Sequence, residues 1–290
     1  QYTVTTPYSS PNWTYLNFVD KEHGFARGAG AVRTNDGGKT WIAWDTYPGE
    51  ADAFALETLN LWYWTQTVDY TSQGEPIRQL FKTTDGGGTK IAGGKLPQWA
   101  VGLPDLLSDA RTLVIAGKGG RIARSEDFGA TWTDVASPTT SDLAMPRFAD
   151  DNNGWVFGGK QVFRTQDGGR TWRAQVSDNT GDVKRLIPLR WDQAFFIAER
   201  IYRTRDAGMN WIAAPYASDL GPSGGVWDLA LGDGGRVYGA GGNSMIASPD
   251  GGLTWNDLPT RADRVDAFGP NHVWAVYNGA DRNVFSRSVD

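Results

Sequence analysis

The chain of 290 residues contains no cysteine, and this absence excludes a disulfide framework and thiolate chemistry. Histidine is scarce, with two residues in all, which leaves little material for a metal site built on imidazole ligands. No stretch approaches about eighteen consecutive apolar residues, so we expect no membrane-spanning segment. Basic charge is not in excess either, because the net charge is -5, and this argues against a nucleic-acid partner.

Glycine, proline and apolar residues are, by contrast, plentiful. The chain has 37 Gly and 14 Pro, which suit many short strands joined by turns, and 40% of its residues are hydrophobic, enough to bury a large core. A motif of the form Ser/Thr-x-Asp-x-Gly-x-Thr-Trp recurs along the whole length. Its complete copies are Thr34–Trp41, Ser125–Trp132, Thr165–Trp172 and Ser248–Trp255.

Two further copies of this motif are altered. Asn210 replaces Thr in the copy at Thr204–Trp211, and Lys90 replaces Trp in the copy at Thr83–Lys90. The aspartates of the six copies are Asp36, Asp85, Asp127, Asp167, Asp206 and Asp250, which are spaced 49, 42, 40, 39 and 44 residues apart. A near-regular period in this range indicates a repeat architecture.

The residue types of the motif predict a tight turn between two strands. Asp and Ser/Thr side chains bind nearby backbone N–H groups, and Gly adopts the positive φ that other residues resist. Thr and Trp suit the first positions of the next strand, where they pack on a pleated surface. We therefore interpret the six aspartates as structural turn residues and not as metal ligands.

The end of the chain indicates a seventh repeat. Phe285–Asp290 matches the start of another copy, and Asp290 lies 40 residues after Asp250. Tyr2–Thr6, with β-branched and aromatic residues before Pro7, can supply the last strand of that repeat. We predict an all-β fold, a seven-bladed β-propeller of four-stranded antiparallel blades, which forms a single domain over residues 1–290 and is closed by the N-terminal strand.

A second pattern accompanies the motif in each repeat. In blade four, three predicted strands precede the motif, at Arg147–Asp150, Asn153–Gly158 and Val162–Thr165. The first strand follows the pattern Phe-x-Asp, and the second follows the pattern His/Asn-Gly-Trp/Phe-x-x-Gly. The motif resembles the Asp-box, or bacterial neuraminidase repeat (BNR). Together the patterns resemble the photosystem II stability/assembly factor-like family of seven-bladed propellers over essentially the whole chain. Blade two departs most, and its segment Leu61–Glu75 predicts an extended hairpin.

This resemblance implies a non-catalytic, extracytoplasmic scaffold that binds a protein partner, with a segment of a membrane protein as one alternative. It implies no cofactor, and we expect a monomer. The implied location is the periplasm, the thylakoid lumen or outside the cell, and the start at Gln1 without a signal peptide is that of a mature or trimmed N-terminus. The same motif occurs in sialidases and other glycosidases, so a carbohydrate-active or sugar-binding propeller is the alternative.

A glycosidase site is not evident in the sequence. No sialidase-like Arg-Ile-Pro motif precedes Asp36, and the similar letters Arg185–Pro188 fall in blade five. Other glycosidases need two facing carboxylates, and spacing singles out no pair. The available carboxylates are Glu57, Glu75, Asp105, Asp109, Asp142 and Asp228. We predict no catalytic residue.

The two histidines occupy equivalent places in the repeat. His23 lies in blade one and His272 in blade seven, each next to the start of the second strand. They are half of a metal site or, in the interpretation that we favour, polar turn residues copied with the repeat. We predict no metal site.

A row of basic residues stands immediately before the motifs, and Ala247 is its one exception. This basic row consists of Arg33, Lys82, Arg124, Arg164, Arg203 and Arg287. Strand alternation points these side chains away from the apolar positions that precede them. They either pair between blades and stack on motif Trp residues, or they form a positive surface that binds an acidic partner segment.

Several tryptophans fit no position of the repeat. They are Trp62, Trp64, Trp99, Trp191 and Trp227. Exposed Trp residues would suit sugar stacking or a protein-binding hot spot, and buried ones would fill space between blades.

Overall fold

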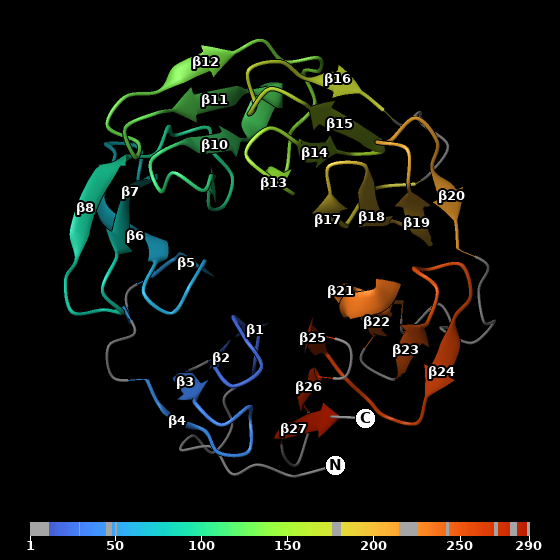
Figure 1. The fold of residues 1–290 in the computed structure, drawn as a ribbon. Coiled ribbons are helices and arrows are strands. Elements are labelled where there is room, and N and C mark those ends of the chain that lie inside the picture. The colour runs from blue at the N-terminus through green and yellow to red at the C-terminus, as the bar shows by residue number, and fades with distance from the viewer. Residues whose placement is uncertain are drawn as a thin grey trace. The chain divides into compact units, whose positions relative to one another are not determined.

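The computed structural model describes residues 12–28, 30–44, 48–49, 51–175, 181–214, 225–241, 244–269, 272–278 and 283–288. These residues form seven antiparallel sheets, six of four strands and one of three (Figure 1). In the described part of the chain, helix is limited to the 3-10 segments η1 (Lys118–Gly120) and η3 (Asp233–Gly235). The fold is the all-β, seven-bladed propeller of four-stranded antiparallel blades that the sequence predicts.

The chain comprises two compact units, and unit 1 consists of Gln1–Gly49 and Ala214–Asp290. It contains blades one, six and seven. Blade one is β1 (Tyr15–Phe18), β2 (Gly24–Arg27), β3 (Ala31–Thr34) and β4 (Ile42–Ala43). Blade six is β21 (Asp228–Leu231), β22 (Val237–Ala240), β23 (Met245–Ser248) and β24 (Asn256–Leu258). Blade seven is β25 (Arg264–Phe268), β26 (His272–Asn278) and β27 (Asn283–Ser288).

Unit 2 consists of Glu50–Ala213 and contains blades two to five. Blade two is β5 (Ala53–Leu56), β6 (Trp62–Tyr70), β7 (Pro76–Thr83) and β8 (Ile91–Lys95). Blade three is β9 (Asp105–Leu106), β10 (Leu113–Ala116), β11 (Ile122–Ser125) and β12 (Thr133–Val135). Blade four is β13 (Arg147–Phe148), β14 (Gly154–Gly158), β15 (Gln161–Thr165) and β16 (Arg173–Ala174). Blade five is β17 (Arg185–Arg190), β18 (Gln193–Ile197), β19 (Ile201–Thr204) and β20 (Ile212–Ala213).

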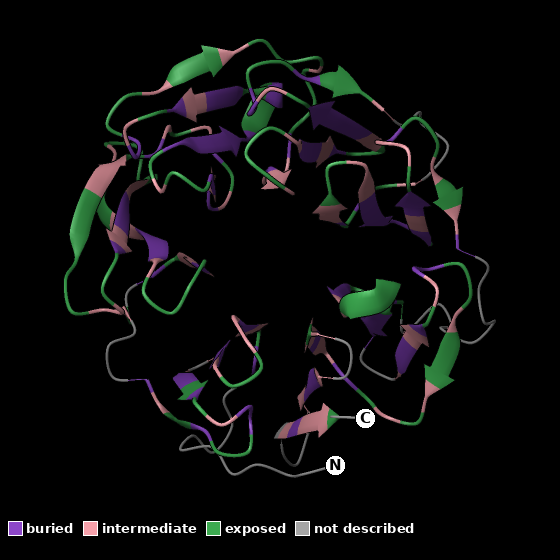
Figure 2. Ribbon diagram, viewed as in Figure 1, coloured by how far each residue is buried: buried purple, intermediate pink, exposed green. Residues whose placement is uncertain are grey.

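The second and third strands of the blades carry most of the buried side chains (Figure 2). All four residues of β10 are buried, whereas both residues of β16 are exposed. Strands that are buried on both faces read as continuous apolar runs, and this explains why Leu113–Ala116 lacks the alternation of a half-buried strand. The apolar second and third strands therefore provide the core, and the short fourth strands face solvent.

Aspartates on the first strands link neighbouring blades within each unit. In unit 2, Asp105 Oδ2 accepts a hydrogen bond of 2.6 Å from the N–H of Phe148. In unit 1, Asp266 Oδ2 accepts one of 2.5 Å from Phe18 N–H, and Asp228 Oδ2 accepts one of 3.2 Å from Val265 N–H. A charged acceptor forms a stronger bond than a neutral one, so these contacts fix one blade against the next.

Aromatic packing joins blade seven to blade one. Trp274 stacks on Phe18 with 3.6 Å between ring centroids and 9° between planes, and its indole N–H donates to Gly37 O at 2.8 Å. Trp13 is also buried, against Phe285. The N–H of Trp13 donates to the side chain of Asn278 at 2.7 Å, and Asn278 Nδ2 donates back to Trp13 O at 2.8 Å.

The described residues thus tie the region near Trp13 to the last blade. The closing strand predicted at residues 2–6 and the predicted turn residue Asp290 lie outside the described residues. The extended hairpin predicted in blade two is confirmed, because β6 and β7 have nine and eight residues and pair from Trp62–Thr83 to Tyr70–Pro76. Across the described ranges, no helix has the length and apolar character needed to cross a membrane.

Candidate functional site

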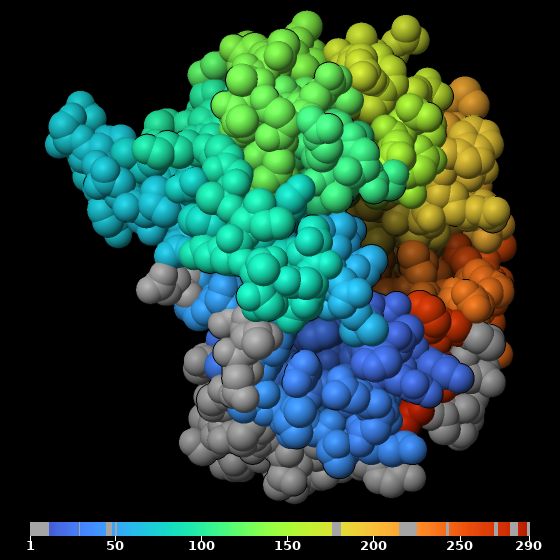
Figure 3. All heavy atoms as spheres, turned by 60° about the vertical axis from the view of Figure 1, so that its left-hand side comes forward, coloured from blue at the N-terminus to red at the C-terminus, as the bar shows by residue number. Residues whose placement is uncertain are grey.

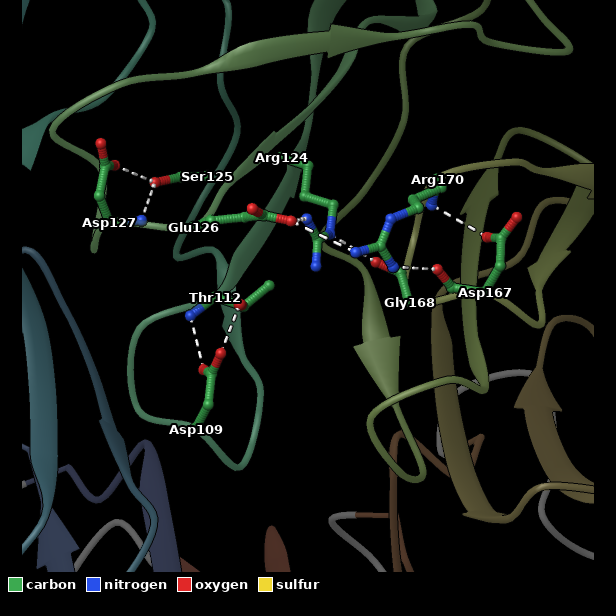
Figure 4. Close-up of polar contacts among 9 residues, drawn as sticks. All are labelled: Asp109, Thr112, Arg124, Ser125, Glu126, Asp127, Asp167, Gly168 and Arg170. Carbon is green, nitrogen blue, oxygen red and sulfur yellow. Dashed lines mark hydrogen bonds and ion pairs between the residues drawn. The ribbon is translucent and has the colours of Figure 1, made fainter.

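The six motif copies form turns of one geometry, which we call box turns. In the turn of blade three, Ser125 Oγ donates to Asp127 Oδ1 at 2.8 Å and accepts from Gly129 N–H at 2.7 Å (Figure 4). Asp127 also accepts from the backbone N–H and the hydroxyl of Thr131, at 2.8 and 2.7 Å. Its carboxylate is therefore engaged in its own turn.

The altered box turns keep these contacts by substitution. In blade five, Asn210 Nδ2 donates to Asp206 Oδ2 at 2.7 Å, in place of the usual Thr hydroxyl. In blade two, the ammonium of Lys90 lies 3.9 Å from the centroid of the Phe81 ring, so a cation packs on an aromatic face where other turns carry Trp. The box turn therefore keeps its geometry when single residues of the motif are replaced.

Hydrogen bonds to the carboxylates stabilise their charged form. The backbone hydrogen bond from Thr131, with the side-chain bonds of Thr131 and Ser125, lowers the pKa of Asp127 to about 2. The pKa of Asp36 is also about 2, because hydrogen bonds from Thr40, Thr34 and Lys39 outweigh the effect of burial, which raises it. These aspartates are charged acceptors at neutral pH, and their structural role stays a prediction that stability measurements can test.

Three members of the basic row reach from one blade of unit 2 to the next. Lys82 Nζ donates to Ala110 O at 2.7 Å, and Arg124 Nε donates to Gly168 O at 3.0 Å. Arg164 Nη2 donates to Trp191 O at 2.7 Å. Each acceptor is a backbone carbonyl in a turn of the following blade, so these cations act as inter-blade links.

Glu126 adds an ionic contact to the link between blades three and four. Its carboxylate pairs with Arg124 and, at 3.3 Å, with Arg170 of the next box turn (Figure 4). Aromatic stacking involves rings other than the motif Trp residues. Lys82 lies 4.3 Å from the centroid of Phe128, and the guanidinium carbon of Arg164 lies 5.3 Å from that of Trp155.

The remaining members of the basic row differ in exposure. Arg33 is exposed, whereas Arg203 is buried. Arg287 is partly buried beside the first box turn, where a β-carbon at Gly37 would lie 3.2 Å from its guanidinium carbon. Identical positions in the repeat therefore do not give identical surfaces, and the binding role of the basic row stays a prediction.

A pocket of about 210 Å³ lies on blade four beside its box turn. It is lined by Arg164, Gln166, Asp167, Thr171, Arg173 and Gln175. Arg164 and Arg173 are directly opposite each other on β15 and β16, an arrangement of like charges that destabilises a sheet unless an anion compensates it. Asp167 does not supply that anion, because Thr165, Arg170 and Thr171 donate to its carboxylate.

Arg164 enters this pocket with an unsatisfied donor. The residue is only 6% exposed, and its Nε–H has no hydrogen-bond partner among the described residues. Burial lowers the pKa of Arg164, because the charged form is poorly solvated there, while the negative charges of Asp150 and Asp192 oppose the shift and compensate part of its charge. Arg173, by contrast, is exposed, and its guanidinium group has no hydrogen bond or ion pair with the described part of the chain. The pocket thus offers two guanidinium groups to an anion.

Two of the carboxylates considered from the sequence lie close enough to interact. Burial, then the charge of Asp105, raises the pKa of Glu57 to about 7, while Arg147 opposes the shift. Glu57 is nevertheless an exposed residue, so its side chain is surrounded by protein atoms on one side and remains accessible to water. Asp105 is engaged by Phe148 N–H and lies 3.6 Å from Arg147 Nη1.

The other candidate carboxylates are separate from this pair. Asp109 accepts from Thr112, Asp142 from Gly119 N–H and Asp228 from Val265 N–H, which are structural contacts. Glu75 lies at the exposed tip of the hairpin β6–β7. Spacing along the sequence could not identify Glu57 and Asp105, because they belong to different blades.

The histidines lie in unlike surroundings. His23 Nδ1 lies 2.8 Å from Asp20 Oδ2, and the ring of His272 stacks on Trp274 at 5.9 Å. No group of three His, Cys, Asp or Glu residues suited to a metal ion occurs in the described ranges.

The unassigned tryptophans divide into two groups. Trp62 and Trp64 belong to the core and Trp99 packs against it, partly buried, whereas Trp191 and Trp227 are 56% and 39% exposed. Trp191 follows β17 and is the residue whose carbonyl accepts from Arg164. Arg173 and Gln175 had no signal in the sequence, because the pairing of β15 with β16 brings this segment beside Arg164, and Gln166 is a variable position of the motif.

No protein-family model matches this chain, and no curated protein matches its sequence. Solved structures do match its fold. YCF48 bound to a D1 peptide is 20% identical, with a TM-score of 0.67, and the match covers 97% of this chain and 93% of the other. YCF48 from Cyanidioschyzon merolae is 17% identical, with a TM-score of 0.66 and coverages of 98% and 97%.

A glycoside hydrolase also shares the fold. The GH74 xyloglucanase from Xanthomonas campestris is 16% identical, with a TM-score of 0.54, and the match covers 95% of this chain but 50% of the enzyme. The predicted resemblance to the photosystem II assembly factor propellers is confirmed by the two YCF48 structures. At these identities the likeness establishes a fold, and function has to be argued from the site.

Proposed function

We propose that this chain is a non-catalytic propeller scaffold that binds an acidic segment of a partner protein at the pocket on blade four. The observation that carries the proposal is the pocket of blade four, where the buried Arg164 and the exposed Arg173 lie opposite each other on β15 and β16. A carboxylate would pair with the exposed Arg173 and offset the positive charge that the two opposed arginines bring to the pocket. Planar guanidinium groups are well suited to this, because they bind carboxylates through two parallel hydrogen bonds.

The surroundings of the pocket support a peptide ligand. Trp191 is exposed next to Arg164, and aromatic side chains of this kind anchor protein interfaces. A YCF48 structure with the same fold holds a D1 peptide, which is consistent with a peptide-binding role for such propellers. By analogy with an assembly factor, we place the protein outside the cytoplasm, as a monomer whose partner can be a segment of a membrane protein.

Members of the basic row contribute unequally in this proposal. Arg164 belongs to the pocket, whereas Arg33 is exposed in the other unit. Lys82 and Arg124 serve first as inter-blade links, so reversing their charge would disturb folding. The exposed Arg173 is therefore the residue whose reversal tests binding.

The test is a titration with a fluorescein-labelled peptide rich in Asp and Glu, followed by fluorescence anisotropy. Arg173→Glu should raise the Kd by about tenfold or more at low salt, with an unchanged melting temperature. Added salt should weaken wild-type binding, because exposed charges are screened over about 10 Å at about 0.1 M.

Lys118→Glu supplies the matched control, because Lys118 is an exposed cation in η1 on blade three, away from the pocket. The same peptide with Asn and Gln in place of Asp and Glu controls for charge. An equal loss of affinity in Lys118→Glu and Arg173→Glu, or no loss in either, contradicts binding at the pocket.

A carbohydrate-active propeller is the second candidate, and Glu57 is the observation that favours it. A pKa of about 7 is what a general acid in a glycosidase requires, and a xyloglucanase shares the fold. The engagement of Asp105 by Phe148 and Arg147 weighs against it, because the second carboxylate has to reach the sugar. Hydrolysis of xyloglucan or of a nitrophenyl glycoside, lost in Glu57→Gln, would replace the scaffold proposal with an enzyme.

A further inference from the structure

Blade two carries a long hairpin that other described blades lack. Strands β6 and β7 have nine and eight residues, whereas β14 and β15 of blade four have five each. We call residues 67–77 the hairpin arm. Figure 3 shows this arm, in cyan, projecting from the remainder of unit 2.

The hairpin arm is an ordered element rather than a loose insertion. Its strands pair from Thr67–Arg78 to Tyr70–Pro76, with a bulge at Val68. Its turn is closed by Thr71 N–H donating to Glu75 O at 2.8 Å, and by Glu75 N–H donating to the Thr71 hydroxyl at 3.1 Å. A pre-ordered arm can bind without the entropy cost of first becoming ordered.

One edge of the arm is open. Pairing of β5 with β6 ends at Thr65, whose carbonyl accepts from Asp52 N–H at 2.8 Å. Within the described ranges, residues 67–70 have no strand partner on that side. An unpaired edge exposes backbone donors and acceptors, which makes it a template for another strand. A strand added here would displace the bond of 2.8 Å that the Tyr70 N–H donates to Asp69 Oδ1. The segment also exposes two large hydrophobic side chains, since Tyr70 and Val68 are 63% and 41% exposed.

The charged residues around the open edge indicate the charge of the segment that can bind there. Asp52, Asp69 and Glu75 are all exposed, and Asp52 accepts from the Thr67 hydroxyl at 2.9 Å. Of the nearby cations, Arg78 is turned back to donate to Ala100 O at 2.6 Å, and Lys90 donates to the side chain of Gln66 at 2.8 Å. The edge is therefore negative. A second copy of this chain would bring the same carboxylates and be repelled, whereas a basic segment would be attracted.

From the open edge, the exposed apolar side chains and the three carboxylates, we infer that the hairpin arm binds an extended, basic segment of a partner protein. The segment would add as a strand beside residues 67–70, with backbone hydrogen bonds providing affinity and alternate side chains contacting Val68 and Tyr70. Lysine or arginine at the intervening positions would face the carboxylates. This site is distinct from the pocket on blade four and takes the opposite charge.

The test uses a labelled peptide in which Lys and Thr alternate with Val, titrated against the whole protein. Wild type should bind it, and the double variant Asp69→Lys, Glu75→Lys should raise the Kd by about tenfold or more. The matched control is Glu22→Lys, Asp257→Lys, which reverses two exposed carboxylates in unit 1 and should leave the Kd unchanged. Methylating alternate backbone nitrogens of the peptide should abolish binding, because strand addition needs those N–H groups.

Three results would overturn the inference. If the methylated peptide bound as tightly as the unmethylated one, strand addition would be excluded. If the control variant lost as much affinity as the hairpin variant, the effect would come from the net charge of the protein and not from the hairpin arm. Dimerisation of wild type in sedimentation equilibrium, lost in the hairpin variant, would make a second copy the occupant. Arg173→Glu should not change the affinity for the basic peptide, so this site and the pocket on blade four can fail independently.

Discussion

Replacing Asp36 by alanine removes the carboxylate that accepts four hydrogen bonds in the first box turn. Thr34 Oγ1 donates to this carboxylate at 2.7 Å, Lys39 N–H at 3.0 Å, and Thr40 through its N–H and hydroxyl at 2.9 and 2.6 Å. Four bonds at about 1 kcal/mol each would total about 4 kcal/mol. The turn is half exposed and water can replace part of them, so we expect a loss of about 2 kcal/mol.

Urea denaturation and thermal melting followed by circular dichroism measure this loss. A change of about 2 kcal/mol corresponds to a fall in Tm of about 4–8 °C for a domain of this size class. Asp36→Asn should lose about half as much, because its amide oxygen still accepts from the two backbone N–H groups. Asp182→Ala, at an exposed aspartate without hydrogen bonds to the described residues, should change the stability by less than about 0.5 kcal/mol.

The structural role of the box aspartates would be refuted by equal stability of Asp36→Ala and Asp182→Ala. It would also be refuted if Asp36→Ala abolished binding of the acidic peptide while its unfolding curve stayed that of wild type. The first result would mean that water serves the turn as well as the carboxylate does. The second would mean that the aspartate contacts the partner.

Two other expectations concern pH and the chain start. The pKa of Glu57 is raised to about 7 from 4.5, so its ionisation opposes folding, and the stability of wild type should fall as pH rises between these values. Glu57→Gln should remove that fall in urea denaturation, and a pH-independent difference between the two proteins would contradict it. Removing residues 1–8, which include the predicted closing strand, should lower the Tm by exposing a sheet edge of blade seven. An unchanged Tm would contradict closure by that strand.

The fold was predictable because its information is local. In each box turn the Ser/Thr and Asp side chains form their hydrogen bonds within eight consecutive residues, as in Thr34–Trp41, so residue types and spacing reveal both the turn and the number of repeats. The extended hairpin was visible for the same reason, as an excess of residues between two turns. Turns of this kind are determined by residues that are close together in the sequence.

The candidate site was less predictable because it depends on residues that meet only in three dimensions. Arg33 and Arg164 hold the same place in the repeat, yet one is exposed and the other is 6% exposed. The difference for Arg164 comes from Trp191 and Asn153, whose oxygens accept its hydrogen bonds. The pair of Glu57 and Asp105 likewise joins two blades. No spacing rule within one repeat describes such contacts.

The links between blades have a consequence for how the protein can change. The inter-blade hydrogen bonds of Lys82, Arg124 and Arg164 go to the following blade, as does that of Asp105 on the first strands. When each blade interacts mainly with its neighbours, a substitution at one contact changes the stability of that blade interface and leaves the other interfaces unaffected. The hairpin of blade two and the pocket of blade four are separated by blade three. Selection could therefore reshape one recognition surface while leaving the other intact, and a single chain could acquire or exchange partners blade by blade.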